Sequence, residues 1–168
     1  MSELLFEVTY PHPPEHVWRA LTDAEALAAW LMPNDFQPVV GHHFTFQAPP
    51  QPGFDGIVRC EVLAVEPPRR LSYSWQGGPL KTPTTVSWTL AAIDEGTKLR
   101  LVHSGFAGIG GLIARLILGE GWRGLLKQDL PHALQVQAVI RPQETEAGAR
   151  NKQRWRHWCI LPSSVILR

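Results

Sequence analysis

Cysteine is scarce in this chain. Its 168 residues include only two, Cys60 and Cys159, which are too few and too far apart for a disulfide framework or a metal knuckle. The first ten residues, with Glu3 and Glu7, also lack the basic start and the apolar run of a secretory signal. We therefore expect free thiols, a reducing compartment and a cytoplasmic location.

Charge is also sparse. Asp, Glu, Lys and Arg make up 18% of the residues, and the formal net charge of +1 gives no basis for nucleic-acid binding through phosphate neutralisation. The longest apolar runs fall short of the roughly 18 residues that a membrane-spanning helix needs. Residues 1–140 hold ten Lys and Arg against thirteen Asp and Glu, whereas residues 141–168 hold six against two. This shift predicts one domain over residues 2–139 and a basic C-terminal tail, 140–168, which is either an extension outside the core or a partner contact.

Catalytic and cofactor motifs are missing from the sequence. It has no phosphate-binding loop, no dinucleotide-binding glycine pattern after a strand, no nucleophile elbow and no paired-histidine zinc helix. His42 and His43 are neighbours in a predicted strand, so their side chains point to opposite faces and do not favour one metal site. We expect no catalytic constellation, no metal site and no cofactor.

The N-terminal third has the pattern strand, helix, helix. Residues 4–10 alternate between apolar and polar, which is typical of a half-buried strand. Pro14 is well placed at the first turn of a short helix. Thr22 followed by Glu25 fits a capping box, which predicts a second helix from about residue 23 to 30.

The middle of the chain has the pattern of an antiparallel sheet, and the last third that of helices. Between residues 36 and 103 short runs of period two alternate with turns, which predicts six or seven strands in all. Residues 108–119 then place apolar side chains at helical spacing between glycines, which predicts a small helix on flexible joints. A longer helix is expected over 120–139, with a kink at Pro131 because proline lacks the N–H that would bond Lys127.

This order is that of an α+β helix-grip fold, and four segments also resemble a known family. They are Pro14 to Asp23, Gly56 to Trp75, Gly96 to Phe106 with its His-Ser-Gly-Phe ending, and Gly121-Trp122. Together they resemble, over about residues 5–136, the bacterial homologues of the C-terminal domain of the Hsp90 ATPase activator. These AHSA1-like proteins belong to the START/Bet v1-like SRPBCC superfamily. The resemblance implies a curved sheet around a long C-terminal helix, two short helices after the first strand, and a cavity.

The sequence departs from that family between the His-Ser-Gly-Phe segment and Gly-Trp, where members usually carry a more polar connection. Here the connection is apolar, and three interpretations stand: a lid over the cavity mouth, a dimer contact or an additional core helix. The candidate lid residues are Ile109, Leu112, Ile113, Leu116 and Ile117.

A set of aromatic residues is expected on the inner side of the sheet. Parity along the strands and helices places the following side chains there as candidate cavity-lining residues: Trp30, Phe44, Phe46, Tyr73, Trp75, Trp88, His103, Trp122 and Leu126. They either line a pocket without filling it or form a plain core. His103 shares a face with Leu99 and Leu101, so a buried imidazole is predicted, with either a structural role or one in ligand recognition or acid–base work.

These patterns favour a binding module with no catalysis. The expected partner is a small, mostly apolar molecule in the cavity, with His103 or Tyr73 orienting it. The alternatives are a co-chaperone or other protein-interaction module, in which a chaperone or other protein contacts the surface, and a cyclase or hydrolase that uses the cavity. The expected assembly is a monomer or a homodimer.

Overall fold

Six antiparallel strands form a single sheet in the order β1-β6-β5-β4-β3-β2. In the computed structural model, which describes residues 3–139, the strands are β1 (Leu4–Tyr10), β2 (His43–Gln47), β3 (Ile57–Glu66), β4 (Arg70–Trp75), β5 (Thr84–Ile93) and β6 (Gly96–Ser104). Consecutive strands pair except for β1, which crosses to the far edge and pairs with β6, Leu4 opposite His103 and Tyr10 opposite Thr97. The predicted α+β helix-grip class is confirmed. The predicted tail, 140–168, lies outside the described residues.

Two short helices, α1 (Pro14–Thr22) and α2 (Ala24–Trp30), follow β1 as predicted. Pro14 occupies the first turn of α1. The predicted cap of α2 was wrong by one residue, because Asp23 and not Thr22 accepts the hydrogen bond from the Ala26 amide, at 2.9 Å. Thr22 is still helical and its hydroxyl donates to the Trp18 carbonyl of α1, so Asp23 is left as the first residue free to cap α2.

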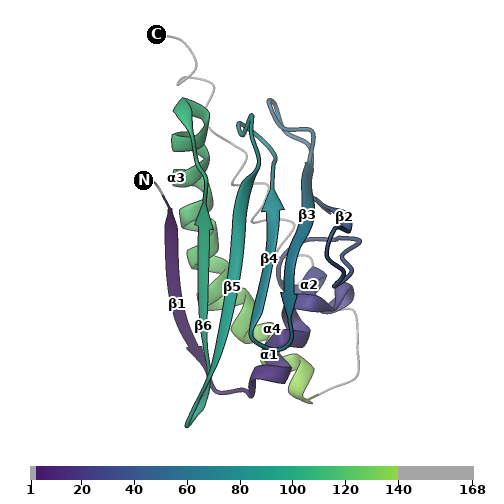
Figure 1. The fold of residues 1–168 in the computed structure, drawn as a ribbon, viewed down its shortest axis with the longest axis vertical. Coiled ribbons are helices and arrows are strands. Elements are labelled where there is room, and N and C mark those ends of the chain that lie inside the picture. The colour runs from purple at the N-terminus through teal and green to yellow at the C-terminus, as the bar shows by residue number, and fades with distance from the viewer. Residues whose placement is uncertain (1–2, 140–168) are drawn as a thin grey trace.

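One long helical element covers the sheet where two had been predicted. It consists of α3 (Gly108–Gly124), a π-helical turn η1 (Leu125–Asp129) and α4 (Leu130–Val139), without an intervening loop. It runs diagonally behind the sheet from β1 and β6 to α1 and α2 (Figure 1). The wide turn lies just ahead of Pro131, and the Leu130 amide reaches back five residues to Leu125. The π-helical turn therefore lets the helix continue past Pro131, close to the position of the predicted kink.

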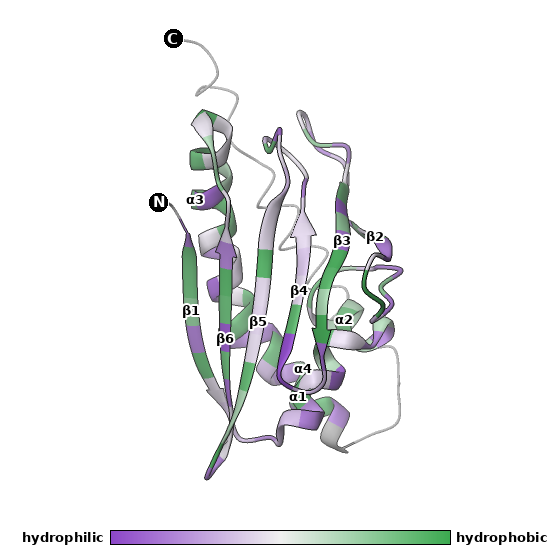
Figure 2. Ribbon diagram, in the orientation of Figure 1, coloured by the Kyte–Doolittle hydropathy of each residue, from purple (hydrophilic) through white to green (hydrophobic). Residues whose placement is uncertain are grey.

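The core lies between the sheet and these helices, on what we call the inner face. Along β5 and β6 buried and less buried side chains alternate, as a strand with one covered face requires. Figure 2 shows the corresponding alternation of hydrophobic and hydrophilic residues along the strands. The Tyr10 hydroxyl donates to the Leu126 carbonyl at 2.6 Å and so ties β1 to the long helix. No helix in the described part of the chain is long and apolar enough to cross a membrane.

Candidate functional site

The nine predicted cavity-lining residues come together on the inner face. The sheet supplies six of them through β2, β4, β5 and β6, while α2 supplies one and the long helix two. Each is at most 2% exposed to solvent. These residues are Trp30, Phe44, Phe46, Tyr73, Trp75, Trp88, His103, Trp122 and Leu126.

Their rings form one connected aromatic layer. Trp88 lies at the centre, with ring centroids 6.0 Å from Trp30 and 5.5 Å from Trp122. Trp122 contacts Trp75 at 5.5 Å, and Trp75 contacts Phe46 at 5.4 Å. Most of these pairs are edge-to-face or tilted, the arrangements that aromatic quadrupoles favour. The layer therefore spans the inner face from α2 across the sheet to the long helix.

His103 sits in this layer with both ring nitrogens engaged. The Trp122 indole N–H donates to Nδ1 at 3.1 Å, and since an indole can only donate, Nδ1 carries no proton. Nε2 therefore holds the proton and donates to the Thr84 hydroxyl at 2.7 Å, which in turn donates to the Trp75 carbonyl at 2.8 Å. Burial lowers the pKa of His103 to about 3, so the ring is neutral near pH 7. A ring with both nitrogens occupied has no polar atom left to offer a ligand or a reacting group.

Tyr73 differs from His103 in having an unused donor. Its oxygen accepts a hydrogen bond from the Trp88 indole N–H at 3.0 Å, and within the described residues its own proton has no acceptor. Burial raises the pKa of the phenol well above its usual range, so the proton stays on the oxygen. A buried donor without an acceptor costs about 1–3 kcal/mol. Tyr73 is thus a polar group within the aromatic layer that still has bonding capacity.

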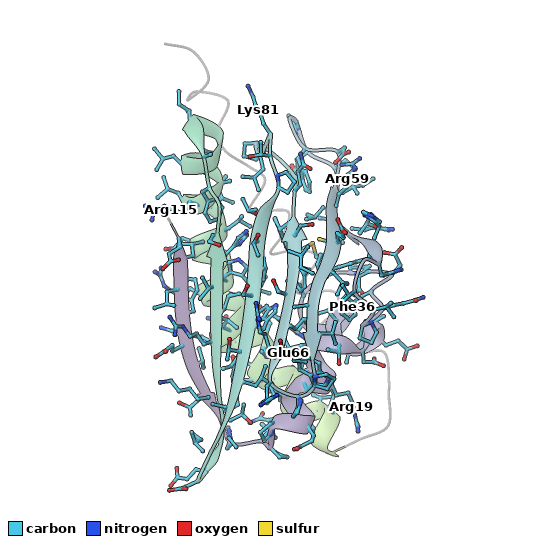
Figure 3. The ribbon with its side chains drawn as sticks, viewed as in Figure 1. Arg19, Phe36, Arg59, Glu66, Lys81 and Arg115 are labelled. Carbon is cyan, nitrogen blue, oxygen red and sulfur yellow. The ribbon has the colours of Figure 1, made fainter. Side chains whose placement is uncertain are left out.

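A small aromatic cluster surrounds the Tyr73 ring. Phe44 and Phe46 on β2 lie 5.5 and 6.2 Å from it between ring centroids, and Phe36 lies 6.5 Å away. Phe36 belongs to the connection between α2 and β2 and lies on the β2 side of the sheet, far from Arg115 on α3 (Figure 3). Cys60 on β3 is also buried, and burial, followed by the effect of Asp35, raises the pKa of its thiol. The thiol therefore stays protonated, as expected for a small buried hydrophobe.

Charged groups lie outside this layer. Buried polar side chains in the described part of the chain are Ser72, Thr84, Thr97 and His103, and none of them is a carboxylate or a basic side chain other than the imidazole. The labelled side chains of Arg59 and Lys81 lie toward one end of the sheet (Figure 3), and those of Arg59 and Glu66 are about half exposed. Nor do the described residues contain a group of three or more His, Cys, Asp or Glu placed to hold a metal ion.

A family model matches this arrangement and its sequence. The family is described as activator of Hsp90 ATPase homolog 1-like protein, and the match covers residues 11–135. The chain belongs to this family. None of the curated proteins matches the sequence, whereas many solved structures match it. The predicted resemblance is therefore confirmed at the level of the family.

Three solved structures illustrate the likeness. Protein MLL2253 from Mesorhizobium loti is 35% identical with a TM-score of 0.71, and the alignment covers 83% of this chain and all of that one. Protein BH1534 from Bacillus halodurans is 29% identical with a TM-score of 0.67, covering 80% and 97% of the two chains. The Aha1 dimer from Colwellia psychrerythraea is 22% identical with a TM-score of 0.65, covering 81% and 98%, and supports the fold alone.

Two residues of the AHSA1-like inner layer were not among the predicted site residues. Thr84 could have been found, because it has the same parity on β5 as Val86, Trp88 and Leu90 and is equally buried. Phe36 lies in an irregular segment with no periodicity, so its position against Tyr73 had no local signal.

The predicted lid segment of the AHSA1-like domain has a different geometry from the one expected. It is the first half of α3 and is continuous with the rest of the long helix, so the expected joint at Gly119 is absent. The helix points Gly111, Ala114 and Leu118 inward. Ile117 is half-buried, and the other four candidate lid residues are exposed along one line, which we call the α3 stripe: Ile109, Leu112, Ile113 and Leu116. A lid role stays a prediction, but these four side chains would not be its inner surface.

The glycines of α3 explain why the segment packs closely. A Cβ at Gly110 would lie 2.5 Å from the Pro79 carbonyl oxygen, and one at Gly111 would lie 2.9 Å from the Phe106 backbone. Real Cβ atoms do not approach backbone that closely, so glycine is required for this contact. Two of the glycines predicted to be hinges thus allow close approach, Gly110 to the β4–β5 connection and Gly111 to the β6–α3 connection.

Proposed function

We propose that this domain binds a small, mostly apolar molecule that carries one hydrogen-bond acceptor, and that the acceptor receives the proton of Tyr73. The observation that carries the proposal is the buried phenol with an unused donor in an otherwise apolar, aromatic layer. Sites for small molecules are typically built in this way, with apolar walls supplying contact area and a few polar groups fixing orientation.

The favoured location for the bound molecule is the β2 side of the aromatic layer, next to Tyr73. Phe36, Phe44 and Phe46 surround Tyr73 there, and Phe36 belongs to an irregular segment, 31–42, that covers the ring. Backbone bonds hold the two ends of this segment, from the Gln47 amide to the Pro33 carbonyl and from the Gly41 amide to the Val62 carbonyl. Between them, side-chain bonds of Asn34 and Asp35 hold the middle, the latter accepting from the Thr45 amide at 2.7 Å. An irregular cover opens more easily than a helix or a strand, because it has fewer cooperative backbone bonds.

The alternative of a cyclase or hydrolase in the same place has less support. Such an enzyme needs at least two acid–base groups converging on one substrate atom. The described inner face offers one imidazole, and Trp122 and Thr84 occupy both of its nitrogens. Tyr73 and Cys60 both have pKa values raised by burial, which removes them as bases near pH 7.

A matched pair of probes tests the proposal. We expect the full chain to bind both 2-acetylnaphthalene, whose carbonyl is an acceptor, and 2-ethylnaphthalene, which has none. The Y73F variant should weaken binding of the ketone by about tenfold and leave binding of the hydrocarbon unchanged. Quenching of tryptophan fluorescence or calorimetry measures both affinities.

The control variant is Y10F. Tyr10 is the only other tyrosine, is also buried, and its hydroxyl is already used by the Leu126 carbonyl. It should change neither affinity. The proposal would be overturned if neither compound bound saturably and if native mass spectrometry showed no retained small molecule after expression in the source organism. Equal loss of both compounds in Y73F would refute the role of its proton.

A further inference from the structure

The α3 stripe is an apolar surface with nothing covering it among the described residues. Its four side chains follow the spacing i, i+3, i+4 and i+7, so they lie on one side of the helix. Ile109 is 80% exposed, Leu112 53%, Ile113 37% and Leu116 64%. The only charged residue between Gly108 and Gly119 is Arg115, and it lies to one side of the stripe.

The helix cannot rotate to bury the stripe. Its opposite side already packs on the body through Ala114, Leu118 and Trp122. The contacts at Gly110 and Gly111 leave no room for any side chain, so only this rotation of α3 places glycine against Pro79 and Phe106. The described residues 3–139 therefore cannot bury the stripe by a rotation of this helix.

The size of the stripe suits half of an interface between two copies. The four exposed fractions amount to about 400 Å² of mainly apolar surface, which is the size of the largest apolar patch on a typical soluble monomer, and such patches are often functional. Two such stripes in contact remove about 800 Å² from water, or roughly half of a standard interface, before any flanking residue is counted. A two-fold axis provides the matching surface automatically, because each copy presents the same patch.

The charges at the two ends of the stripe favour an antiparallel arrangement. Glu120 continues the stripe one turn beyond Leu116, and its side chain is 74% exposed although it pairs with Arg123. At the other end, the N-terminus of α3 begins after Ala107, which gives it no side-chain cap, and Gly108 has open space around it. A two-fold axis between Leu112 and Ile113 would set Glu120 of one copy against that N-terminus of the other, where the helix dipole favours an acidic group.

We propose that the chain forms a homodimer in which the α3 stripes of two copies pack antiparallel around a two-fold axis between Leu112 and Ile113. In this register Ile109 of one copy packs against Leu116 of the other. The inference does not depend on the proposed ligand, because the stripe and Tyr73 lie on different parts of the domain.

The first test is the oligomeric state of the full chain, measured by sedimentation equilibrium across micromolar concentrations. We expect a concentration-dependent dimer for the native protein and at least about a tenfold higher dissociation constant for L116E. L63E is the matched control, because Leu63 on β3 is 44% exposed and lies outside the stripe. It should leave the dimer intact, and circular dichroism should show that both variants are folded.

The second test is the orientation of the helices. In a C159S background, a cysteine at Leu112 lies almost on the axis and should form an intermolecular disulfide under mild oxidation. A cysteine at Ile109 should not, since the antiparallel register separates the two copies of that residue by about 10 Å along the helix. A parallel pair would cross-link at both positions and so refute the register.

Three results would overturn the proposal. They are a native protein that remains monomeric throughout, a dimer that L116E leaves unchanged, and a monomer whose stripe binds neutral phospholipid vesicles or another protein instead of a second copy.

Discussion

The Thr84 hydroxyl makes two hydrogen bonds inside the core. It accepts from the neutral His103 ring and donates to the Trp75 carbonyl, so it links β5 to β6 and to β4. The exposed fraction of the residue is 1%, and water cannot replace either bond without entering the aromatic layer.

Replacing Thr84 by valine should therefore destabilise the domain. The variant keeps the shape of the side chain but leaves the His103 N–H and the Trp75 carbonyl without partners, at a cost of about 1–3 kcal/mol in the free energy of unfolding. Urea denaturation measures the loss. T89V is the control, because Thr89 is exposed on the same strand, and its effect should stay within about 0.5 kcal/mol. Equal effects of the two variants would show that the network does not stabilise the fold.

The burial of His103 was predictable from the sequence, but its partners were not. Alternation with Leu99 and Leu101 is a local signal that places the ring on the inner face. Thr84 and Trp122 each lie 19 residues away in the chain, in opposite directions. Which hydroxyl or indole reaches the ring depends on strand pairing and on the path of the long helix, and neither is encoded near position 103.

Among the helices and strands, the continuous long helix is the element that the sequence pattern predicts least well. Its first half carries glycines at 108, 110, 111, 119 and 121, and glycine lowers helix propensity by about 1 kcal/mol relative to alanine. Tertiary packing requires glycine at 110 and 111 despite that cost, because a Cβ at either position would collide with neighbouring backbone. Strand alternation and the two short helices were predictable because they are local patterns. Helix continuity was not, since the contact of Gly110 is with Pro79, about 30 residues away in the chain.

Two glycine variants separate propensity from packing. G110A should destabilise the domain by at least about 1 kcal/mol, because its Cβ would lie 2.5 Å from the Pro79 carbonyl oxygen and one segment must move. G119A should be neutral or stabilise it by up to about 1 kcal/mol, since its Cβ meets only the movable end of Leu4, at 3.3 Å. Thermal or urea unfolding compares them. If G110A is as stable as G119A, α3 is not fixed by this contact.

For the molecule as a whole, ion pairs contribute little to stability. Arg59–Asp55, Arg70–Glu66 and Lys98–Glu7 lie on the surface with both partners about half exposed, where such pairs are typically worth under about 1 kcal/mol. Moderate salt should therefore change the free energy of unfolding only slightly. The response to pH has a different origin, because it depends on the buried imidazole.

The neutral His103 makes the fold sensitive to mild acid. The pKa of its ring falls from 6.5 to about 3 through burial, so the unfolded chain takes up a proton below pH 6.5 that the folded chain refuses. Stability from this residue is thus complete above pH 6.5 and is lost progressively as the pH falls toward 3, with a limiting slope of about 1.4 kcal/mol per pH unit. Between pH 7 and pH 5, above the range of ordinary carboxyl groups, the expected loss is about 2 kcal/mol.

The H103Q variant isolates this effect. It should be less stable than the native protein at pH 7 but lose about 2 kcal/mol less on going to pH 5, as measured by urea denaturation at both values. H12Q is the control for the other described histidine with a lowered pKa. Partial burial and then the charge of His16 lower the pKa of His12, and H12Q should retain most of the native pH response. NMR of the native protein gives an independent reading, in which the His103 ring keeps its proton on Nε2 and does not titrate down to pH 5. A His103 resonance that titrates near pH 6, or an H103Q variant with the native pH response, would mean that the imidazole is not sealed in the aromatic layer.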